Sequence, residues 1–316
     1  MEILQIIIPE RMINQRIDWA LSEMLPDYSR SKIAAWIKSG DALIDNKTFK
    51  PKDKVNGNEV VNLTLNQKQN NNWIAEKIPL NIVYEDESLL VLNKEAGRVV
   101  HPAVGNRNGT LLNGLLHSFP ELKVIPRVGI VHRLDKDTTG IMVVAKTIES
   151  HTSLVAQLKR RSMKREYEAV VTGVLTGGGI VNATIGRHPV HRKKQAVVEN
   201  GKEAITHYRV IKRFRSHTHV RLNLETGRTH QIRVHMAHIN HRLVGDPLYG
   251  GRLQMPAASS PGFIDTLQAF KRQALHGKRL SLNHPLSGKQ IEWEVEIPKD
   301  MRNLLSALKC DADIID

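Results

Sequence analysis

Residues 66–72 read Asn-Gln-Lys-Gln-Asn-Asn-Asn and contain no apolar side chain. Such a stretch cannot contribute to a hydrophobic core and is typical of a solvated linker. It interrupts a chain of 316 residues, a length that suggests about two domains. The sequence therefore predicts a small domain over residues 1–65, a polar linker over 66–78 and a larger domain over 79–316.

The first domain is predicted to be a compact α/β unit. Apolar residues at helical spacing indicate two helices, of which the second ends near Gly40 and has Ser29 or Ser31 as its N-cap. Short strands are predicted around residues 43–44 and 59–61.

The larger domain is predicted to be rich in strands. Short apolar runs bounded by turn residues indicate buried strands, and alternating runs indicate half-buried ones. These runs lie at residues 88–92, 141–145, 164–171, 205–211 and 217–224, with a helix over 149–161. Because strands arrive in groups and helices fall irregularly between them, the pattern predicts an α+β fold and not a doubly wound parallel sheet.

The positive charge of the chain is concentrated in the larger domain. The chain has 46 Lys and Arg against 32 Asp and Glu, a net charge of +14. Residues 187–235 alone hold twelve Lys or Arg and three Glu, whereas residues 11–60 hold nine basic and seven acidic residues. A solvated face usually mixes both signs, so we interpret the one-sided stretch as a wall that binds a polyanion, most simply nucleic acid.

Several classes of protein are excluded or disfavoured by composition. The single cysteine, Cys310, excludes a disulfide framework and multi-cysteine metal sites. His235, His238 and His241 lie three apart on a predicted helix, a spacing that fans ligands around the helix, so no metal is expected. No targeting segment and no apolar run of membrane length is visible, which predicts a cytoplasmic protein without a membrane partner.

Residues 132–140 form a charged tract, His-Arg-Leu-Asp-Lys-Asp-Thr-Thr-Gly, between two apolar segments. A charged tract in this position is a loop held by a rigid scaffold, where functional groups concentrate. From the pattern alone, Asp135 and Asp137 are turn or capping residues more readily than catalysts.

This tract and four other blocks, in order, resemble the motifs of the RluA family of pseudouridine synthases. The four are Leu-Leu-Val-Leu-Asn-Lys-Glu-Ala-Gly at 89–97 with Val-His-Pro at 100–102, Arg-Glu-Tyr at 165–167, Thr-Gly-Arg-Thr-His-Gln-Ile-Arg-Val-His at 226–235, and Gly-Asp-Pro-Leu-Tyr-Gly at 245–250. The first domain resembles the S-four type of RNA-binding domain. The resemblance covers about residues 11–300, and Glu95 and Arg242 depart from it where the family usually has proline.

The resemblance implies a mixed, largely antiparallel sheet with a central catalytic cleft, and it assigns the chemistry to Asp135. Pseudouridine formation breaks the N-glycosidic bond of a uridine, turns the base and rejoins it through carbon. A hydrolase pairs two carboxylates to activate water, whereas an isomerase must exclude water, so one carboxylate is expected. Asp135 acts either as nucleophile at the anomeric carbon or as base on the neighbouring carbon, and the sequence leaves both routes open. The family gives Arg233 the ion pair that keeps Asp135 anionic in a dry site.

The family also implies how the RNA is held. Tyr167 stacks on the target base, and Arg133 enters the space that a flipped nucleotide leaves, although phosphate contact is a fair rival role for Arg133. The further substrate-binding residues that we predict are His132, Arg228 and Ile232.

The function expected is a cofactor-free, monomeric RNA pseudouridine synthase. The branch of the family that the chain resembles most acts on ribosomal RNA of the large subunit, as naked RNA or in the subunit assembly. Two alternatives are a non-catalytic RNA-binding protein of ribosome assembly and a nucleoside hydrolase that releases the base.

Overall fold

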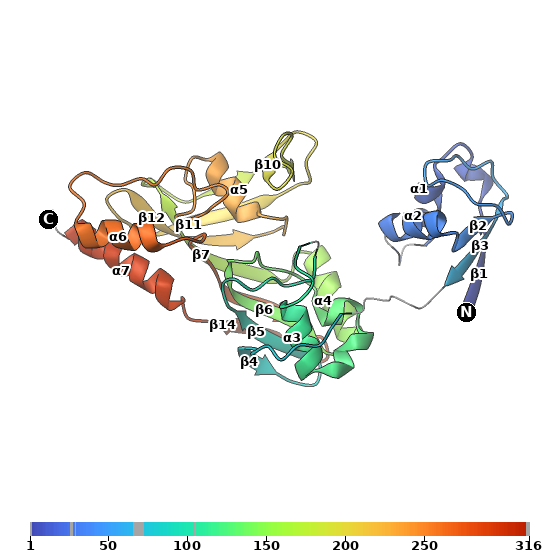
Figure 1. Cartoon of the computed structure of the whole chain (residues 1–316), viewed down its shortest axis with the longest axis horizontal. Coiled ribbons are helices and arrows are strands. Elements are labelled where there is room, and N and C mark those ends of the chain that lie inside the picture. Colours follow the sequence, from blue (N-terminus) through green and yellow to red (C-terminus); the bar gives the residue numbers. More distant parts are fainter. Residues whose placement is uncertain (1, 26–27, 29, 66–72, 104, 314–316) are drawn as a thin grey trace. The chain divides into compact units, whose positions relative to one another are not determined.

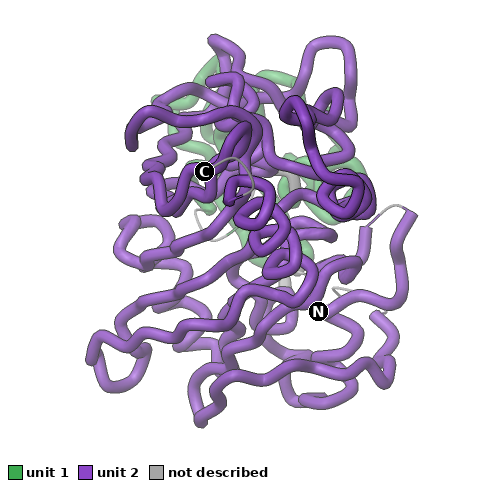
Figure 2. The backbone as a smooth tube through the Cα atoms, turned by 90° about the vertical axis from the view of Figure 1, so that its left-hand side faces the viewer, with its two compact units in different colours: residues 1–72 green, residues 73–316 purple. Residues whose placement is uncertain are grey.

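The computed structural model contains two compact units, residues 1–72 and 73–316 (Figure 2). The part of the chain that the structure describes comprises residues 2–25, 28, 30–65, 73–103 and 105–313. Residues 66–72 of the predicted linker lie outside it. Each unit has a hydrophobic core of its own.

The second unit begins earlier than the composition predicts. Residues 73–78, assigned to the linker from the sequence, are part of this folded unit. The side-chain amide of Asn113 donates to the carbonyl oxygen of Ile74 (2.7 Å), and the backbone N–H of Glu76 donates to the carbonyl oxygen of Asn113 (3.0 Å). Trp73 packs against the main core. This extended segment, in which four of the six side chains are apolar, is thus held by hydrogen bonds to Asn113 and by packing against the main core.

The first unit is a three-stranded antiparallel sheet with two helices. Its elements are β1 (Glu2–Ile7), the 3-10 helix η1 (Glu10–Met12), α1 (Ile17–Met24), α2 (Arg30–Ser39), β2 (Ala42–Ile44) and β3 (Val60–Leu65), and the strand order is β1-β3-β2. Both predicted helices and both predicted strands are present, whereas β1 was not predicted. Ser29 lies outside the described residues, and Ser31 lies within α2 and is therefore not its N-cap.

The second unit is built on one nine-stranded sheet (Figure 1). Its strands, in the order in which they pair, are β4 (Ile82–Glu85), β5 (Leu89–Lys94), β6 (Thr139–Ala145), β13 (Leu275–Asn283), β7 (Lys164–Thr172), β12 (His217–Leu224), β11 (Ile205–Arg213) and β8 (Gly179–Asn182), and β14 (Gln290–Glu294) pairs with β13. β13 runs parallel to β6, and the other neighbours in this order are antiparallel. The predicted mixed, largely antiparallel sheet is confirmed.

Helices cover both faces of this sheet. They are α3 (Leu111–Ser118), η2 (Pro120–Val124), η3 (Pro126–Gly129), α4 (Ile148–Lys159), α5 (Gln231–His238), α6 (Pro261–Ala269) and α7 (Lys299–Asp313), and a hairpin of β9 (Ile185–Arg187) and β10 (Gln195–Val197) precedes β11. Leu90 and Leu92 of β5 pack in the core of α3 and α5, whereas Leu89 and Val91 pack with α4. Burial on both faces explains the continuous apolar runs of β5 and β6. None of the helices in the described residues is long and apolar enough to cross a membrane.

A strained turn leads into the charged tract. Arg127, Val128 and Gly129 have φ values of 54°, 55° and 77°, three left-handed residues in succession. This conformation is rare for a β-branched residue, and Val128 is fully buried there. Backbone strain of this kind persists where the surrounding structure enforces it, and it clusters at functional sites. The turn delivers the chain directly to the loop that contains Asp135.

Candidate active site

A buried lysine at the end of β5, Lys94, holds the loop that contains Asp135. The Nζ atom of Lys94 donates to the carbonyl oxygens of Glu95 (2.6 Å), Arg98 (3.0 Å) and Lys136 (2.8 Å). Lys94 is 3% exposed, and burial lowers its pKa to about 8. The backbone N–H of Thr138 donates to the carbonyl oxygen of Asp135 (3.1 Å) and closes the turn.

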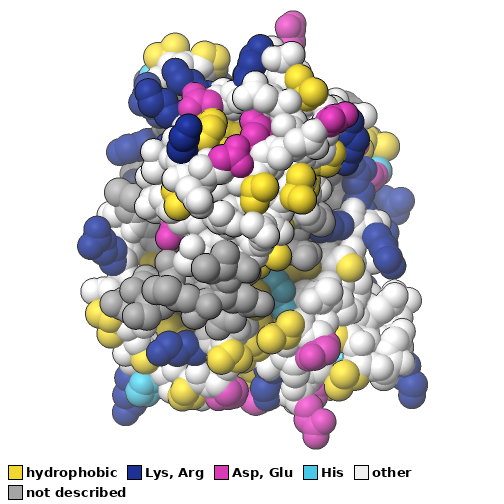
Figure 3. Space-filling model, turned by 90° about the vertical axis from the view of Figure 1, so that its right-hand side faces the viewer, with side chains coloured by type: hydrophobic (Ala, Val, Ile, Leu, Met, Phe, Trp, Pro, Cys, Tyr) yellow, Lys and Arg dark blue, Asp and Glu magenta, His cyan; other side chains and the backbone are white. Residues whose placement is uncertain are grey.

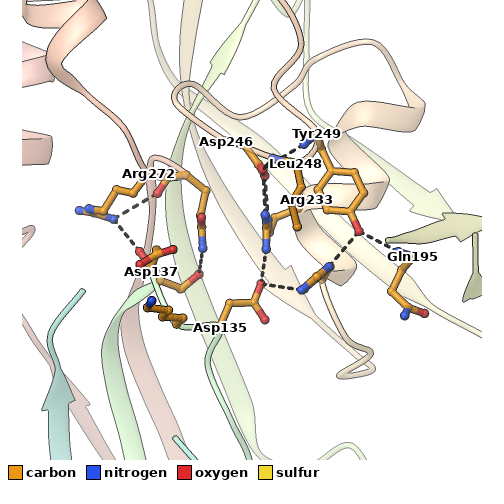
Figure 4. A network of polar contacts seen from close by, with 12 residues as sticks. Asp135, Asp137, Gln195, Arg233, Asp246, Leu248, Tyr249 and Arg272 are labelled. Carbon is orange, nitrogen blue, oxygen red and sulfur yellow. Dashed lines mark hydrogen bonds and ion pairs between the residues drawn. The ribbon is translucent and has the colours of Figure 1, made fainter. Parts of the chain in front are cut away.

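Arg233 lies between two carboxylates (Figure 4). Its Nε and Nη2 atoms donate to Oδ2 and Oδ1 of Asp246 (2.7 and 2.8 Å), and its Nη1 donates to Oδ2 of Asp135 (2.9 Å). The predicted ion pair of Asp135 and Arg233 is therefore present. Burial opposes the charge of Arg233, but the two carboxylates more than offset it and raise the pKa of the guanidinium.

The two carboxylates differ in exposure. The side chain of Asp246 is fully buried, and its Oδ1 also accepts the backbone N–H groups of Leu248 (2.9 Å) and Tyr249 (3.0 Å). The side chain of Asp135 is 17% exposed, and its Oδ1 accepts no hydrogen bond from any described residue. Asp246 is thus a fixed anchor for Arg233, whereas Asp135 keeps one oxygen free for a substrate.

His230 adds a second polar side chain beside Asp135. Its Nε2 lies 3.9 Å from Oδ2 of Asp135, and its Nδ1 lies 2.9 Å from the hydroxyl oxygen of Tyr249. That hydroxyl accepts the backbone N–H of Gln195 (2.8 Å), so its proton is available to Nδ1 and the imidazole N–H then faces Asp135. Burial lowers the pKa of His230, and Asp135 offsets part of this effect.

The helix α5 begins without a side-chain cap. His230 occupies the N-cap position with φ 58° and makes no side-chain cap bond. The amide oxygen of Gln231 instead accepts the backbone N–H of Arg228 (3.0 Å) and the hydroxyl of Thr226 (2.8 Å). The side chain of Gln231 thus ties the preceding loop to the first, buried turn of α5.

Tyr167 lies in β7 with Ala169 and Val171 on the same side, in the main core, as the alternation predicts. Tyr167 is 7% exposed, and a Cβ atom placed at Gly277 of β13 would lie 3.5 Å from its ring. Its hydroxyl makes no hydrogen bond to another residue in the described ranges. Burial raises the pKa of Tyr167; Arg165 lowers it, and Asp135 raises it.

Two of the predicted substrate contacts are arginines at the surface. Arg133 is exposed and has no hydrogen bond or ion pair within the described chain. The Nε atom of Arg228 donates to the carbonyl oxygen of Glu203 (2.9 Å), which holds the side chain against the loop before β11. Arg228 is therefore anchored and Arg133 is not, and the contact of either side chain with substrate stays a prediction.

The other two predicted contacts face inward. The Nε2 atom of His132 accepts the backbone N–H of Val143 in β6 (3.1 Å), and burial lowers the pKa of His132 to about 3. Ile232 is 4% exposed and belongs to the main core. The structure shows packing and loop-anchoring contacts for both residues, and their contact with substrate stays a prediction.

The basic stretch between residues 187 and 235 is only partly available to a polyanion. Five of its twelve basic residues bond to carboxylates or carbonyl oxygens of the protein, namely Arg213, Arg215, Arg221, Arg228 and Arg233. The exposed remainder includes Arg187, Arg192 and Lys193 at the β9–β10 hairpin. On the face drawn in Figure 3, Lys and Arg lie singly or in small groups among uncharged atoms and acidic side chains.

Sequence reasoning assigned no role to Asp246, His230, Tyr249 or Lys94. All four lie within the blocks that carry the family resemblance, which is the signal that could have marked them. Their partners are set by strand order and not by spacing, since Asp246 is 13 residues from Arg233 and Arg233 is 98 residues from Asp135.

The mixed sheet thus places a partly exposed carboxylate, Asp135, against a buried guanidinium, Arg233. Residues 88–238 match the family described as RNA pseudouridylate synthase, and the chain belongs to this family. It is an enzyme, an RNA pseudouridine synthase.

Two similar proteins named Ribosomal large subunit pseudouridine synthase D support this assignment. The one from Pseudomonas aeruginosa (strain PAO1) is 53% identical over 306 residues, covering 97% of this chain and 96% of the relative. The one from Escherichia coli (strain K12) is 53% identical over 305 residues, covering 96% and 94%. The fold is similar to that of human RNA Pseudouridylate Synthase Domain Containing 4, with a TM-score of 0.55 and 24% identity over 72% of this chain and 93% of that chain.

Proposed function

We propose that this enzyme isomerises specific uridines of large-subunit ribosomal RNA to pseudouridine, with Asp135 as the carboxylate that acts on the ribose. The substrate class follows from the names of relatives that are 53% identical over nearly the whole chain. The observation that carries the role of Asp135 is its pair with Arg233, which Asp246 holds from the other side. A carboxylate bound to a fixed cation stays anionic in a dry site, as either route requires.

The free Oδ1 of Asp135 is the atom that would meet the sugar. In the nucleophilic route it bonds to the anomeric carbon as the C1′–N1 bond breaks, and it leaves when C5 of the turned uracil bonds to C1′. In the second route it removes the proton from C2′ and returns it later. In both routes the C5 proton is lost and N1 gains one, so the product is an isomer of the substrate. The geometry is compatible with both routes.

The environment of Arg233 disfavours base release by water. Hydrolysis of a glycosidic bond pairs two carboxylates, one of which activates water. Asp246, the second carboxylate at Arg233, is fully buried and accepts four hydrogen bonds from protein groups. It has no position from which to activate water, and this supports isomerisation over hydrolysis.

Other groups would hold the RNA. Tyr167 would stack on the everted base, Arg133 would fill the vacated position in the RNA, and His132, Arg228 and Ile232 would line or support the site. The first unit, as an S-four-type domain, would dock on neighbouring RNA. We expect a monomeric enzyme in the cytoplasm that uses no cofactor.

The proposal is tested by mapping pseudouridines in large-subunit ribosomal RNA from cells with and without the gene, and by complementing the deletion with variants. Asp135→Asn should form no detectable product, a loss of about 10³-fold or more, and should still bind RNA. Asp137→Asn is the matched control, because it removes a carboxylate two residues away that has no side-chain hydrogen bond to a described residue.

The outcomes separate the alternatives. Restored modification with Asp137→Asn and none with Asp135→Asn supports the proposal. Free uracil as the product would favour a hydrolase. RNA binding without any modification by the wild-type protein would overturn the proposal in favour of a non-catalytic RNA-binding protein.

A further inference from the structure

Arg165, in β7, is a buried cation without an anionic partner. It is 8% exposed, its Nε is enclosed and has no hydrogen-bond partner, and no carboxylate of the described residues forms an ion pair with it. The other buried arginines differ: Arg233 contacts Asp246 and Asp135, and Arg272 donates through Nε and Nη2 to Asp300 (2.7 and 2.9 Å). An isolated buried charge is costly, and proteins nearly always pair it.

The surroundings of Arg165 place it at the active site. Arg165 and Tyr167 are two residues apart in one strand, so both side chains point to the same side of the sheet, about 7 Å apart along it. Its charge also acts on the ring of His132, whose pKa is lowered by burial and further by Arg165. Asp135 raises the pKa of Tyr167 and Arg165 lowers it, so both charges lie near the same tyrosine.

Gly227 keeps the guanidinium uncovered. It lies in the exposed loop between β12 and α5, and a Cβ atom there would come within 2.6 Å of Nη1 of Arg165. Any other residue would press on the end of this side chain. The glycine has no positive φ that would otherwise require it, so the close approach to Arg165 is the reason that the structure offers for it.

We infer that Arg165 binds a backbone phosphate of the substrate RNA beside the everted uridine. Phosphate is the anionic group of RNA, and uracil and ribose are neutral, so a phosphate is the part of the substrate that can neutralise this charge. The planar guanidinium also matches a phosphate with two parallel hydrogen bonds. The inference rests on the proposed function and adds a contact that orients the nucleotide whose base stacks on Tyr167.

The test measures binding of a stem-loop RNA to the full chain in an Asp135→Asn background, where no product forms. The RNA carries a neutral methylphosphonate at one phosphate at a time, on either side of the target uridine. Arg165→Gln should weaken binding to unmodified RNA about 10- to 100-fold, and one methylphosphonate should weaken wild-type Arg165 binding similarly. The two changes together should cost no more than either alone, because they remove the same contact.

Two variants serve as controls. Lys164→Gln removes the same charge from the exposed neighbour on the opposite side of the strand, should change binding about twofold or less, and should leave the methylphosphonate effect intact. Arg165→Lys keeps the positive charge but cannot donate two parallel hydrogen bonds to a phosphate. Its affinity for RNA should therefore lie between those of Arg165→Gln and the protein with Arg165.

The stability of the RNA-free protein distinguishes a binding role from a structural one. Removing an uncompensated buried charge should leave the Tm of Arg165→Gln unchanged or raise it. A lower Tm together with a full methylphosphonate effect in this variant would overturn the inference, as would unchanged RNA binding. If Arg165→Gln fails to fold, Gly227→Ala provides the second reading, because its methyl group displaces the guanidinium and should reduce the methylphosphonate effect without lowering Tm. If the wild-type protein binds the RNA but forms no pseudouridine, the proposed function is refuted. The phosphate contact is then still tested, by the effect of the methylphosphonate on RNA binding.

Discussion

Asp246 holds Arg233 through two parallel hydrogen bonds, Nε to Oδ2 at 2.7 Å and Nη2 to Oδ1 at 2.8 Å. These two bonds leave Nη1 of Arg233 to donate to Asp135. The side chain of Asp246 is itself fully buried. The position of the proposed nucleophile therefore depends on an aspartate that we do not expect to touch the substrate.

Asp246→Asn should impair both stability and turnover. An amide in place of the carboxylate leaves Arg233 with a single anionic partner in a buried site, and breaking a buried pair costs about 3–5 kcal/mol of unfolding free energy. Single-turnover pseudouridine formation should fall strongly in the folded fraction, while the Kd for RNA changes little. The control is Asp311→Asn, which breaks the pair of a 3%-exposed carboxylate with Arg215. It should lower stability but retain turnover, and equal loss of turnover in both variants would contradict a positioning role for Asp246.

Tyr167→Phe and Tyr167→Leu separate the ring from the hydroxyl. Phe preserves the stacking surface, so substrate binding should be nearly unchanged. Leu removes the aromatic face, which is worth roughly 1–3 kcal/mol per stacked base, and should weaken RNA binding accordingly. Equilibrium binding to the stem-loop in the Asp135→Asn background reads this directly. A single-turnover rate of Tyr167→Phe close to wild type would show that the hydroxyl does not transfer a proton in the reaction.

Acid should loosen the loop of Asp135 through His132. Its pKa is about 3 in the folded chain against 6.5 for an ordinary histidine, so as the pH falls through 6.5 the unfolded chain gains a proton that the folded chain does not gain until about pH 3. Stability is therefore lost as the pH falls across this window, by about 1 kcal/mol between pH 7.5 and 5.5 for this one group.

Urea unfolding of His132→Gln at both pH values checks this, because the glutamine oxygen can still accept the N–H of Val143 but does not titrate. The variant should lose about 1 kcal/mol less than the wild type over that interval. His191→Gln, at an exposed position in the β9–β10 hairpin, should lose as much as the wild type. Identical pH dependence in His132→Gln and the wild type would refute the prediction.

Gly140→Ala should damage the sheet directly behind the loop. Gly140 has φ 122°, and a Cβ atom there would lie 2.3 Å from the carbonyl oxygen of Gly277, its partner in the parallel β6–β13 pair. Both the backbone strain and the clash with main-chain atoms oppose the substitution, so the unfolding free energy should fall by more than about 2 kcal/mol. Gly262→Ala in α6 meets no atom within 4 Å and should stay within about 1 kcal/mol of wild type. Equal stabilities of the two variants, by urea denaturation, would argue against the close approach.

The family resemblance singled out Asp135, Tyr167 and Arg233 because each lies in a motif of consecutive residues, which can be recognised in the sequence. Alternation and apolar runs correctly indicated β5, β6, β7, β11 and β12, since burial on one or both faces of a strand leaves a local pattern. The strand β1 was missed, because the run that contains it resembles any short apolar segment. The linker was extended too far, because residues 73–78 fold through backbone bonds to Asn113.

What the sequence alone determined is the set of elements and the loop that bears the proposed nucleophile. What only the tertiary structure decided is which charges meet. Asp246 anchors Arg233, Lys94 supports the loop, and Arg165 has no carboxylate partner among the described residues. The physical reason is that hydrophobic periodicity reports whether a residue is buried, whereas an ion pair depends on distance and direction between residues that strand order brings together. Asp135 and Arg233, 98 residues apart, meet only when the sheet is complete.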